Sequence, residues 1–159
     1  MREATLAVDQ SLRFEDVYRE HGARLLRSVL LFAGDREIAN DAVAEAFAQA
    51  IRRGEDVRSP LPWITRVAFR IAAGELKARR STDYVVVDGP YEMPEPAGEL
   101  VGALAQLSPK QRAAVVLHFR DGYTLAEVAE IIGSTTAAVG VHLNRDRKRL
   151  RASLGDDDA

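Results

Sequence analysis

The residues of this sequence that are best suited to chemistry are cations that end a helix-turn-helix pattern. Thr124 and Glu127 stand at capping-box spacing, and Gly133 supplies the backbone freedom that ends a first helix. Thr135 or Thr136 can cap a second helix. The basic residues near the end of that helix are Arg145, Arg147, Lys148, Arg149 and Arg151. A compact helix pair with an arginine-rich second helix fits the major groove of DNA, and an ordinary helical hairpin with a solvated basic end is the alternative.

A second cationic surface is expected on a helix that starts near residue 60. Ser59 is a cap followed by a proline at the first helical position. One face of this helix carries Arg66, Arg70, Lys77, Arg79 and Arg80. Bases stack on aromatic rings while cations follow the phosphates, so these cations beside Trp63 fit a single-stranded nucleic acid. The alternative is that Trp63 is an anchor of the hydrophobic core.

The segment 35–53 combines a buried stripe with a flat acidic face. Asp35 can cap this helix, and apolar pairs recur every four residues from Ile38 to Ile51. The opposite face carries Glu37, Asp41, Ala44, Glu45, Ala48, Gln49 and Arg52. Small residues among carboxylates predict either a solvated face or a docking surface for a basic partner.

The elements that must position these surfaces are all predicted to be helices. Residues 14–32 have helical apolar spacing that Gly22 interrupts. A second capping box begins another helix at Ser108, and Phe119 is expected among the residues that fill its core. The predicted fold is therefore all-α, with two small helical domains at 11–80 and 100–154. The second domain contains the helix-turn-helix and reads as a small bundle.

The two domains are separated by an acidic segment at 81–99. It holds five carboxylates and three prolines and has no lysine or arginine. This composition predicts a poor helix and a poor core, so the segment is expected to be a flexible linker. In the alternative, the two domains pack together and hide their DNA-binding faces. Residues 155–159 form a second acidic stretch, a tail.

Composition excludes several classes of protein. The chain has 159 residues, a net charge of −2 and no cysteine, so thiolate metal sites and disulfides are excluded. No apolar run approaches the roughly 20 residues of a membrane span, and the start lacks the core of a signal peptide, so a cytoplasmic protein without membrane insertion is expected. No histidine pair has metal-ligand spacing, and no nucleophile motif or phosphate-binding loop occurs. We therefore expect no metal, no cofactor, no catalytic residues and no enzyme.

Taken in order, these pieces resemble the extracytoplasmic-function (group IV) sigma factors of bacterial RNA polymerase, which belong to the sigma-70 family. The resemblance covers residues 11–154. The stretches that carry it are 14–21, 34–37, 41–47, 62–68, 107–112, 124–129 and 145–151. Each stretch alone is weak evidence for the resemblance, but the order of all the stretches along the chain is specific to this family.

The resemblance implies that the loop at 54–59 and the helix after it bind the promoter −10 element and hold its melted strand. One base is taken from the stack into a pocket made by this loop and helix. The residues on which this role falls are Asp56, Arg58, Ser59, Trp63, Arg66, Arg70 and Lys77.

The resemblance also implies roles for the other two surfaces. The second domain places its recognition helix in the −35 major groove and packs on the polymerase β flap. The −35 residues are then Thr135, Thr136, His142, Asn144, Arg145, Arg147 and Lys148. The acidic face docks on the β′ clamp coiled coil through Asp41, Glu45, Ala48 and Gln49. The implied partners are the RNA polymerase core and promoter DNA, and whether an anti-sigma factor binds is left open.

The sequence departs from the family pattern at several positions. Ala44 replaces a common glutamine, Gly74 replaces a common aspartate, and Gly140 and His142 stand where basic residues are frequent. These changes affect the expected strength and sequence of promoter binding. Two other functions stay open: a helix-turn-helix regulator that acts without core polymerase, and a sigma-like protein-interaction factor with weak DNA binding.

Overall fold

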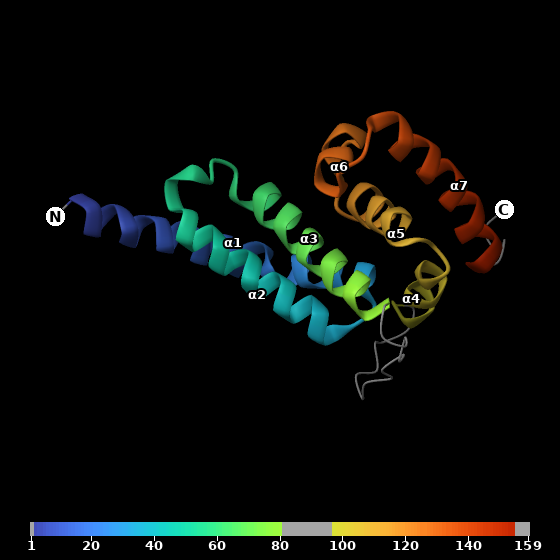
Figure 1. Ribbon diagram of the computed structural model, residues 1–159, viewed down its shortest axis with the longest axis horizontal. Coiled ribbons are helices and arrows are strands. Elements are labelled where there is room, and N and C mark those ends of the chain that lie inside the picture. The colour runs from blue at the N-terminus through green and yellow to red at the C-terminus, as the bar shows by residue number, and fades with distance from the viewer. Residues whose placement is uncertain (1, 81–96, 155–159) are drawn as a thin grey trace.

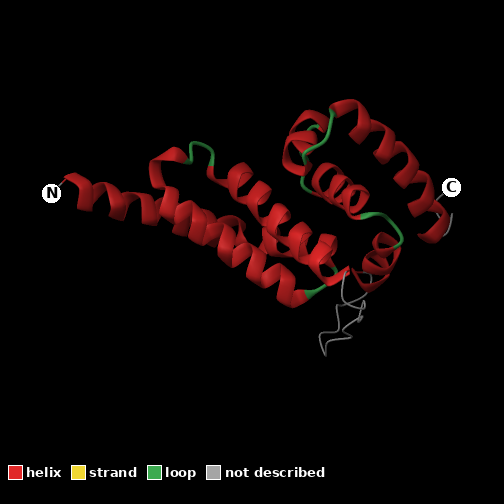
Figure 2. Cartoon of the chain, in the orientation of Figure 1, coloured by secondary structure: helices red, strands yellow, loops and turns green. Residues whose placement is uncertain are grey.

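The computed structural model describes residues 2–80 and 97–154, and every regular element in these ranges is helical (Figure 2). The α-helices are α1 (Arg2–Ala33), α2 (Arg36–Arg53), α3 (Pro60–Arg80), α4 (Ala97–Ala105), α5 (Pro109–Val115), α6 (Leu125–Ile132) and α7 (Thr136–Leu154). A 3-10 turn, η1 (Gly54–Asp56), follows α2, and a π-helical turn, η2 (Val116–Arg120), follows α5. The prediction of an all-α fold is confirmed.

The first helix is longer than its apolar pattern indicated. Helix α1 runs through Gly22 without interruption, so the expected break at this residue is wrong. Gly22 serves close packing instead, because a Cβ built at this position would lie only 3.2 Å from Cδ2 of Tyr18. The Tyr18 ring in turn meets the edge of Phe47, with ring centroids 5.2 Å apart. The glycine therefore makes room for an aromatic contact between α1 and α2.

Helices α1, α2 and α3 pack on one another around a stripe rich in alanine. The residues that α2 buries are Ile38, Ala39, Ala42, Val43, Ala46, Phe47 and Ala50, as the four-residue repeat predicted. Ile51, the last member of that repeat, is an exception, because it is 51% exposed. Asp35 caps α2 by accepting a hydrogen bond from the Ile38 backbone N–H at 2.9 Å. The same carboxylate accepts a bond from Arg79 Nη1 at 2.6 Å. Asp35 therefore joins the start of α2 to the last turns of α3.

Helices α4 to α7 form a second group, which contains the helix-turn-helix. The capping boxes of Ser108 with Gln111 and of Thr124 with Glu127 are both formed. Gly133 ends α6 in the left-handed conformation, with φ of 67°. Thr135 caps α7, because its hydroxyl oxygen accepts a bond from the Ala138 backbone N–H at 3.1 Å. The predicted helix-turn-helix is therefore built as its caps indicated.

Two expectations for this group need correction. The linker was expected to reach residue 99, but α4 already begins at Ala97; the rest of the linker, 81–96, and the tail 155–159 lie outside the described residues.

Phe119 was expected in the core, but it is 55% exposed. The helix widens there, since the Asp121 N–H bonds to the Val116 carbonyl at 3.1 Å, five residues back. The wider turn faces Phe119 outward while Val116 and Leu117 stay buried.

The two groups of helices pack against each other (Figure 1). Helix α3 lies on α6, and α1 lies on α5 and η2. Helix α7 packs on α4, α5 and α6, so α5 and α6 separate it from α3 (Figure 1). We call the contact region between α1–α3 and α5–α6, which includes η2, the seam.

Candidate nucleic-acid interface

The cationic face of α3 borders the seam. Helical spacing places Trp63, Arg66, Arg70 and Lys77 along one side of the helix. Trp63 is half-buried against the core, whereas Arg70 and Lys77 are exposed. The Arg66 side chain is 29% exposed and lies 3.5 Å from the Glu130 carboxylate of α6. Trp63 therefore combines a core contact with a position on the predicted binding face.

The structure brings five of the seven predicted −10 residues to one groove of about 330 Å³. These five residues are Asp56, Arg58, Ser59, Trp63 and Arg66. The opposite wall of the groove belongs to the second group of helices, through Tyr123, Glu127, Glu130 and Ile131. Arg70 lines a separate, mainly apolar cavity of about 160 Å³ between α3 and the start of α5, and Lys77 lines neither space. Helix α6 thus faces much of the surface that the sequence analysis assigned to DNA.

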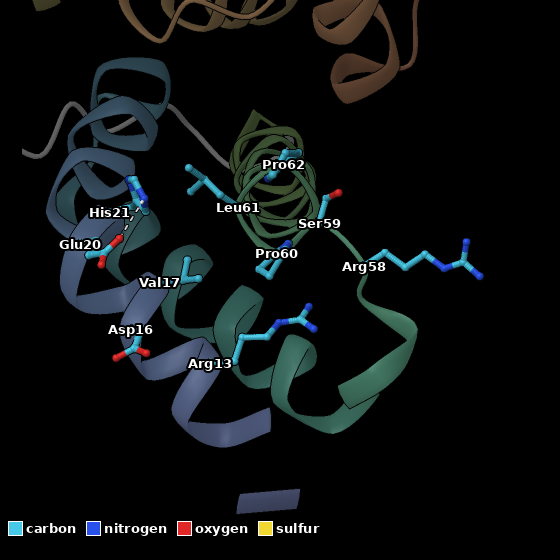
Figure 3. Close-up of a pocket in the computed structure, with 10 residues that line it drawn as sticks. All are labelled: Arg13, Asp16, Val17, Glu20, His21, Arg58, Ser59, Pro60, Leu61 and Pro62. Atoms are coloured by element: carbon cyan, nitrogen blue, oxygen red, sulfur yellow. Dashed lines mark ion pairs between the residues drawn. The ribbon is translucent and has the colours of Figure 1, made fainter. Parts of the chain in front are cut away.

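A wider hollow of about 800 Å³ lies on the other side of the loop that precedes α3, against α1 (Figure 3). Its α1 wall carries Arg13, Asp16, Glu20 and His21, none of which the sequence analysis assigned to a site. Figure 3 shows Arg13 reaching toward the loop, and its guanidinium donates a hydrogen bond to the Val57 carbonyl. No local signal in the sequence marks this contact, because Arg13 and Val57 are 44 residues apart. Arg13 therefore helps to hold the loop that separates the two hollows.

A buried polar cluster joins the two groups across the seam. The Ser28 hydroxyl, which is 1% exposed, donates a hydrogen bond to Asp121 Oδ1 at 2.9 Å. Arg120 Nη1 lies 3.0 Å from the same oxygen, and Arg24 Nη2 donates to the Arg120 carbonyl at 2.8 Å. Farther along, Arg112 Nε donates to a carbonyl of α1, that of Phe32, at 2.8 Å. These contacts favour the packed arrangement that the sequence analysis had weighed against two independent domains.

The other end of the seam is tied by an aromatic hydroxyl. Tyr123 Oη donates a hydrogen bond to Thr65 Oγ1 at 3.3 Å. Burial raises the pKa of the Tyr123 phenol above its ordinary value, although the hydrogen bond with Thr65 acts in the opposite direction. The phenol therefore remains a neutral donor at neutral pH.

The recognition helix α7 lies away from the seam and presents its predicted residues to solvent. The exposed members of the predicted −35 set are Thr135, Thr136, Asn144, Arg145, Arg147 and Lys148. His142 differs from them, because it is half-buried and its Nδ1 atom is buried without a hydrogen-bond partner among the described residues. Val141, which the sequence analysis did not select, is 53% exposed on the same helix.

The acidic face of α2 is also open. Asp41 and Glu45 are exposed, and Ala48 and Gln49 are half-buried. Glu45 lies 2.8 Å from Arg52 Nη2 and accepts a hydrogen bond from Gln49 Nε2 at 3.3 Å. The hydrogen bond from Arg52 is the largest cause that holds the pKa of Glu45 below its ordinary value, followed by that from Gln49. The face is therefore less negative than its carboxylates alone indicate, since Arg52 shares it.

Replacing Arg52 with alanine is expected to raise the pKa of Glu45 toward the ordinary carboxyl value. A carboxyl-carbon NMR titration measures this, and Arg53→Ala is the matched control that should leave the Glu45 titration in place. Because the folded-state pKa is lowered, the contact stabilises the fold above the unfolded-state pKa of Glu45, and this stabilisation is lost as the pH falls through the folded-state pKa. An unchanged Glu45 titration in Arg52→Ala would contradict the assigned cause.

No helix within 2–80 or 97–154 is long and apolar enough to cross a membrane. In the same residues, no cluster of three or more histidine, aspartate or glutamate side chains has an arrangement that could hold a metal ion.

Comparison with known proteins finds a family match in the second group of helices. Residues 97–150, from α4 into α7, match the family described as Sigma-70, region 4. The RNA polymerase sigma factor CarQ of Myxococcus xanthus is 26% identical over 156 residues, which cover 90% of each chain. The ECF RNA polymerase sigma factor SigM of Mycobacterium tuberculosis is 26% identical over 151 residues, covering 89% of this chain and 77% of SigM.

A solved structure agrees in fold. The sigma factor RpoE of Bartonella quintana, solved in complex with the anti-sigma factor NepR, superposes with a TM-score of 0.70 at 20% identity, covering 91% of this chain and 99% of RpoE. The chain belongs to the extracytoplasmic-function sigma factors of the sigma-70 family.

Proposed function

We propose that this chain is an alternative sigma factor that binds core RNA polymerase, directs it to specific promoters and helps to melt the −10 region. The observation that carries the proposal is the capped helix-turn-helix of α6 and α7, most of which falls within the region-4 match. Its relatives CarQ and SigM are named as RNA polymerase sigma factors and align along nearly the whole chain. In this role the chain acts in the cytoplasm and performs no catalysis of its own.

In this proposal, the surfaces on α3, α7 and α2 each bind a different target. The α3 face and the 54–59 loop bind the −10 element, where cations follow the phosphates and Trp63 offers a ring for stacking. The outer face of α7 enters the −35 major groove. The open acidic face of α2, with Asp41 and Glu45 at its centre, docks on the β′ clamp coiled coil. Residues 11–80 and 100–154 thus act as two functional units joined by the acidic segment.

An anti-sigma partner fits the same proposal. The related RpoE was solved with the anti-sigma factor NepR. The apolar cavity of about 160 Å³ at the seam of this chain, lined by Phe32, Phe69, Ile131 and Ile132 among others, is a place where such a partner can insert apolar side chains.

Transcription in vitro with purified core RNA polymerase on a library of genomic fragments tests the proposal. Specific transcripts are expected only when the chain is added to the core enzyme. A mobility-shift assay with and without core enzyme separates this function from a regulator that acts alone. Sequence-specific binding without core enzyme, and no new transcript with it, would favour the independent regulator.

Reversing the charges of Asp41 and Glu45 to lysine is expected to weaken binding to core enzyme by roughly tenfold or more, because like charges then face a basic partner. The double variant Glu15→Lys/Glu75→Lys changes the net charge equally at exposed positions outside the face and should bind normally. Affinity is measured by fluorescence anisotropy at physiological salt. Equal affinities for the two double variants would remove the acidic face from the proposal.

A further inference from the structure

The outer face of α7 is apolar over its first turns. Val139 and Leu143 are buried against the rest of the group, and a helix advances by about 100° per residue. Ala137 and Val141 therefore point away from the core, and both are exposed. At 53% exposure, Val141 is the one large hydrophobic side chain of α7 that is exposed within the described residues. Helix α7 packs on α4, α5 and α6 and lies at the outer side of the second group of helices (Figure 1).

The residues beside Val141 do not project as it does. Gly140 has no side chain, and a Cβ built there would lie 4.0 Å from Leu125 Cδ1 of α6. His142 is half-buried, with its Nδ1 enclosed in protein and without a hydrogen-bond partner in the described part of the chain. The first cations, Arg145 and Arg147, come a full turn or more later. Val141 is therefore the side chain that projects outward from the second turn of α7.

The chemistry of the major groove gives this side chain a specific counterpart. Each base pair presents a distinct pattern there, and the C5-methyl group of thymine is its only apolar feature. An exposed valine has no donor or acceptor to offer a base edge, but its two methyl groups can pack on the thymine methyl. Asn144, exposed almost one turn later, carries the amide that pairs with adenine.

We infer that Val141 is a specificity-determining residue that reads the C5-methyl group of a thymine in the −35 element. The inference rests on the proposed function, since it places α7 in the −35 major groove. It assigns base reading to a residue outside the predicted −35 set, next to His142. The −35 element chosen by this chain is then rich in A·T pairs at the position of the second helical turn.

A uracil substitution tests this contact. A −35 sequence is first selected from a randomised library with the full chain, with and without core enzyme. Each selected thymine is then replaced by uracil, which differs only by loss of the methyl group. The wild-type chain is expected to prefer thymine at one position by about fourfold, the effect of one buried methyl group. Val141→Ala is expected to bind the thymine and uracil duplexes equally.

Two variants serve as controls. Val141→Thr keeps the shape and one methyl group, so it should retain part of the preference for thymine. Arg149→Ala removes an exposed cation of the same helix and should weaken all duplexes alike while keeping the full preference. Thermal melting of each variant checks that the exposed substitutions leave the fold intact.

The outcomes separate the inference from the proposed function. A wild-type chain that does not distinguish thymine from uracil, or a Val141→Ala variant that still does, overturns the inference even if the holoenzyme transcribes. If the chain selects a duplex but drives no transcription with core enzyme, the proposed function fails while the uracil comparison still decides the role of Val141. A chain that selects no duplex overturns both.

Discussion

Replacing Arg66, Arg70 and Lys77 together with alanine is expected to make the salt dependence of open-complex formation shallower by about 2 in the slope of log K against log salt. Each phosphate contact to a single strand releases counterions and contributes about 0.7 to that slope. The three side chains share one face of α3, so they can follow one strand. Permanganate reactivity of the −10 thymines should fall in parallel, and it measures melting directly.

Two controls isolate this effect. The triple variant Arg19→Ala/Arg27→Ala/Arg53→Ala removes the same charge from exposed positions outside the face and should keep the wild-type slope. Glu130→Gln breaks the ion pair of Arg66 across the seam but leaves the cation in place. Normal permanganate reactivity and an unchanged slope in the α3 variant would remove this face from the melting step.

Replacing Asp121 with alanine is expected to lower the free energy of unfolding by about 1.5–3 kcal/mol, the range for hydrogen bonds to charged groups. The Asp121 side chain is only 10% exposed, and it accepts bonds from Ser28 and Arg120. The variant leaves the Ser28 hydroxyl without its acceptor across the seam. The seam should therefore loosen, which small-angle scattering measures as a larger radius of gyration.

Asp121→Asn provides the matched comparison. The amide keeps an oxygen for Ser28 and loses the charge that faces Arg24 and Arg120, so its effect should be intermediate. Glu75→Ala, at an exposed position of α3, should stay within about 0.5 kcal/mol of the parent. A radius of gyration and a stability equal to those of the parent in Asp121→Ala would show that this cluster does not hold the seam.

Local signals predicted much of the fold. The capping boxes at Ser108 and Thr124 and the left-handed Gly133 mark helix ends through bonds between residues close in sequence, and all are formed. The alanine stripe of α2 is buried as its period indicated up to Ala50, but Ile51 is exposed. Gly22 and Phe119 were misread for a physical reason. Gly22 makes room for the Tyr18 ring, and Phe119 faces outward because it lies in a π-helical turn. Neither feature can be recognised from the spacing of apolar residues.

The contacts across the seam could not be predicted from sequence patterns. Ser28 and Asp121 are 93 residues apart, and a serine in an apolar helix gives no hint that it will meet a carboxylate. Five of the seven predicted −10 residues line one groove, but the opposite wall of that groove, which includes residues of α6, was not predicted. The exposed Val141 lies outside the predicted −35 set, which contains only polar and basic residues.

The groove between α3 and α6 also gives the molecule an optical property. Trp63 is the only tryptophan in the sequence, and it lines that groove beside Tyr123 and Glu127. Indole emission shifts with the polarity around the ring, and all tryptophan emission of the chain comes from this one place. Separation of α6 from α3 changes the surroundings of that single emitter. The chain therefore carries a built-in, label-free reporter of whether its two groups of helices are together or apart.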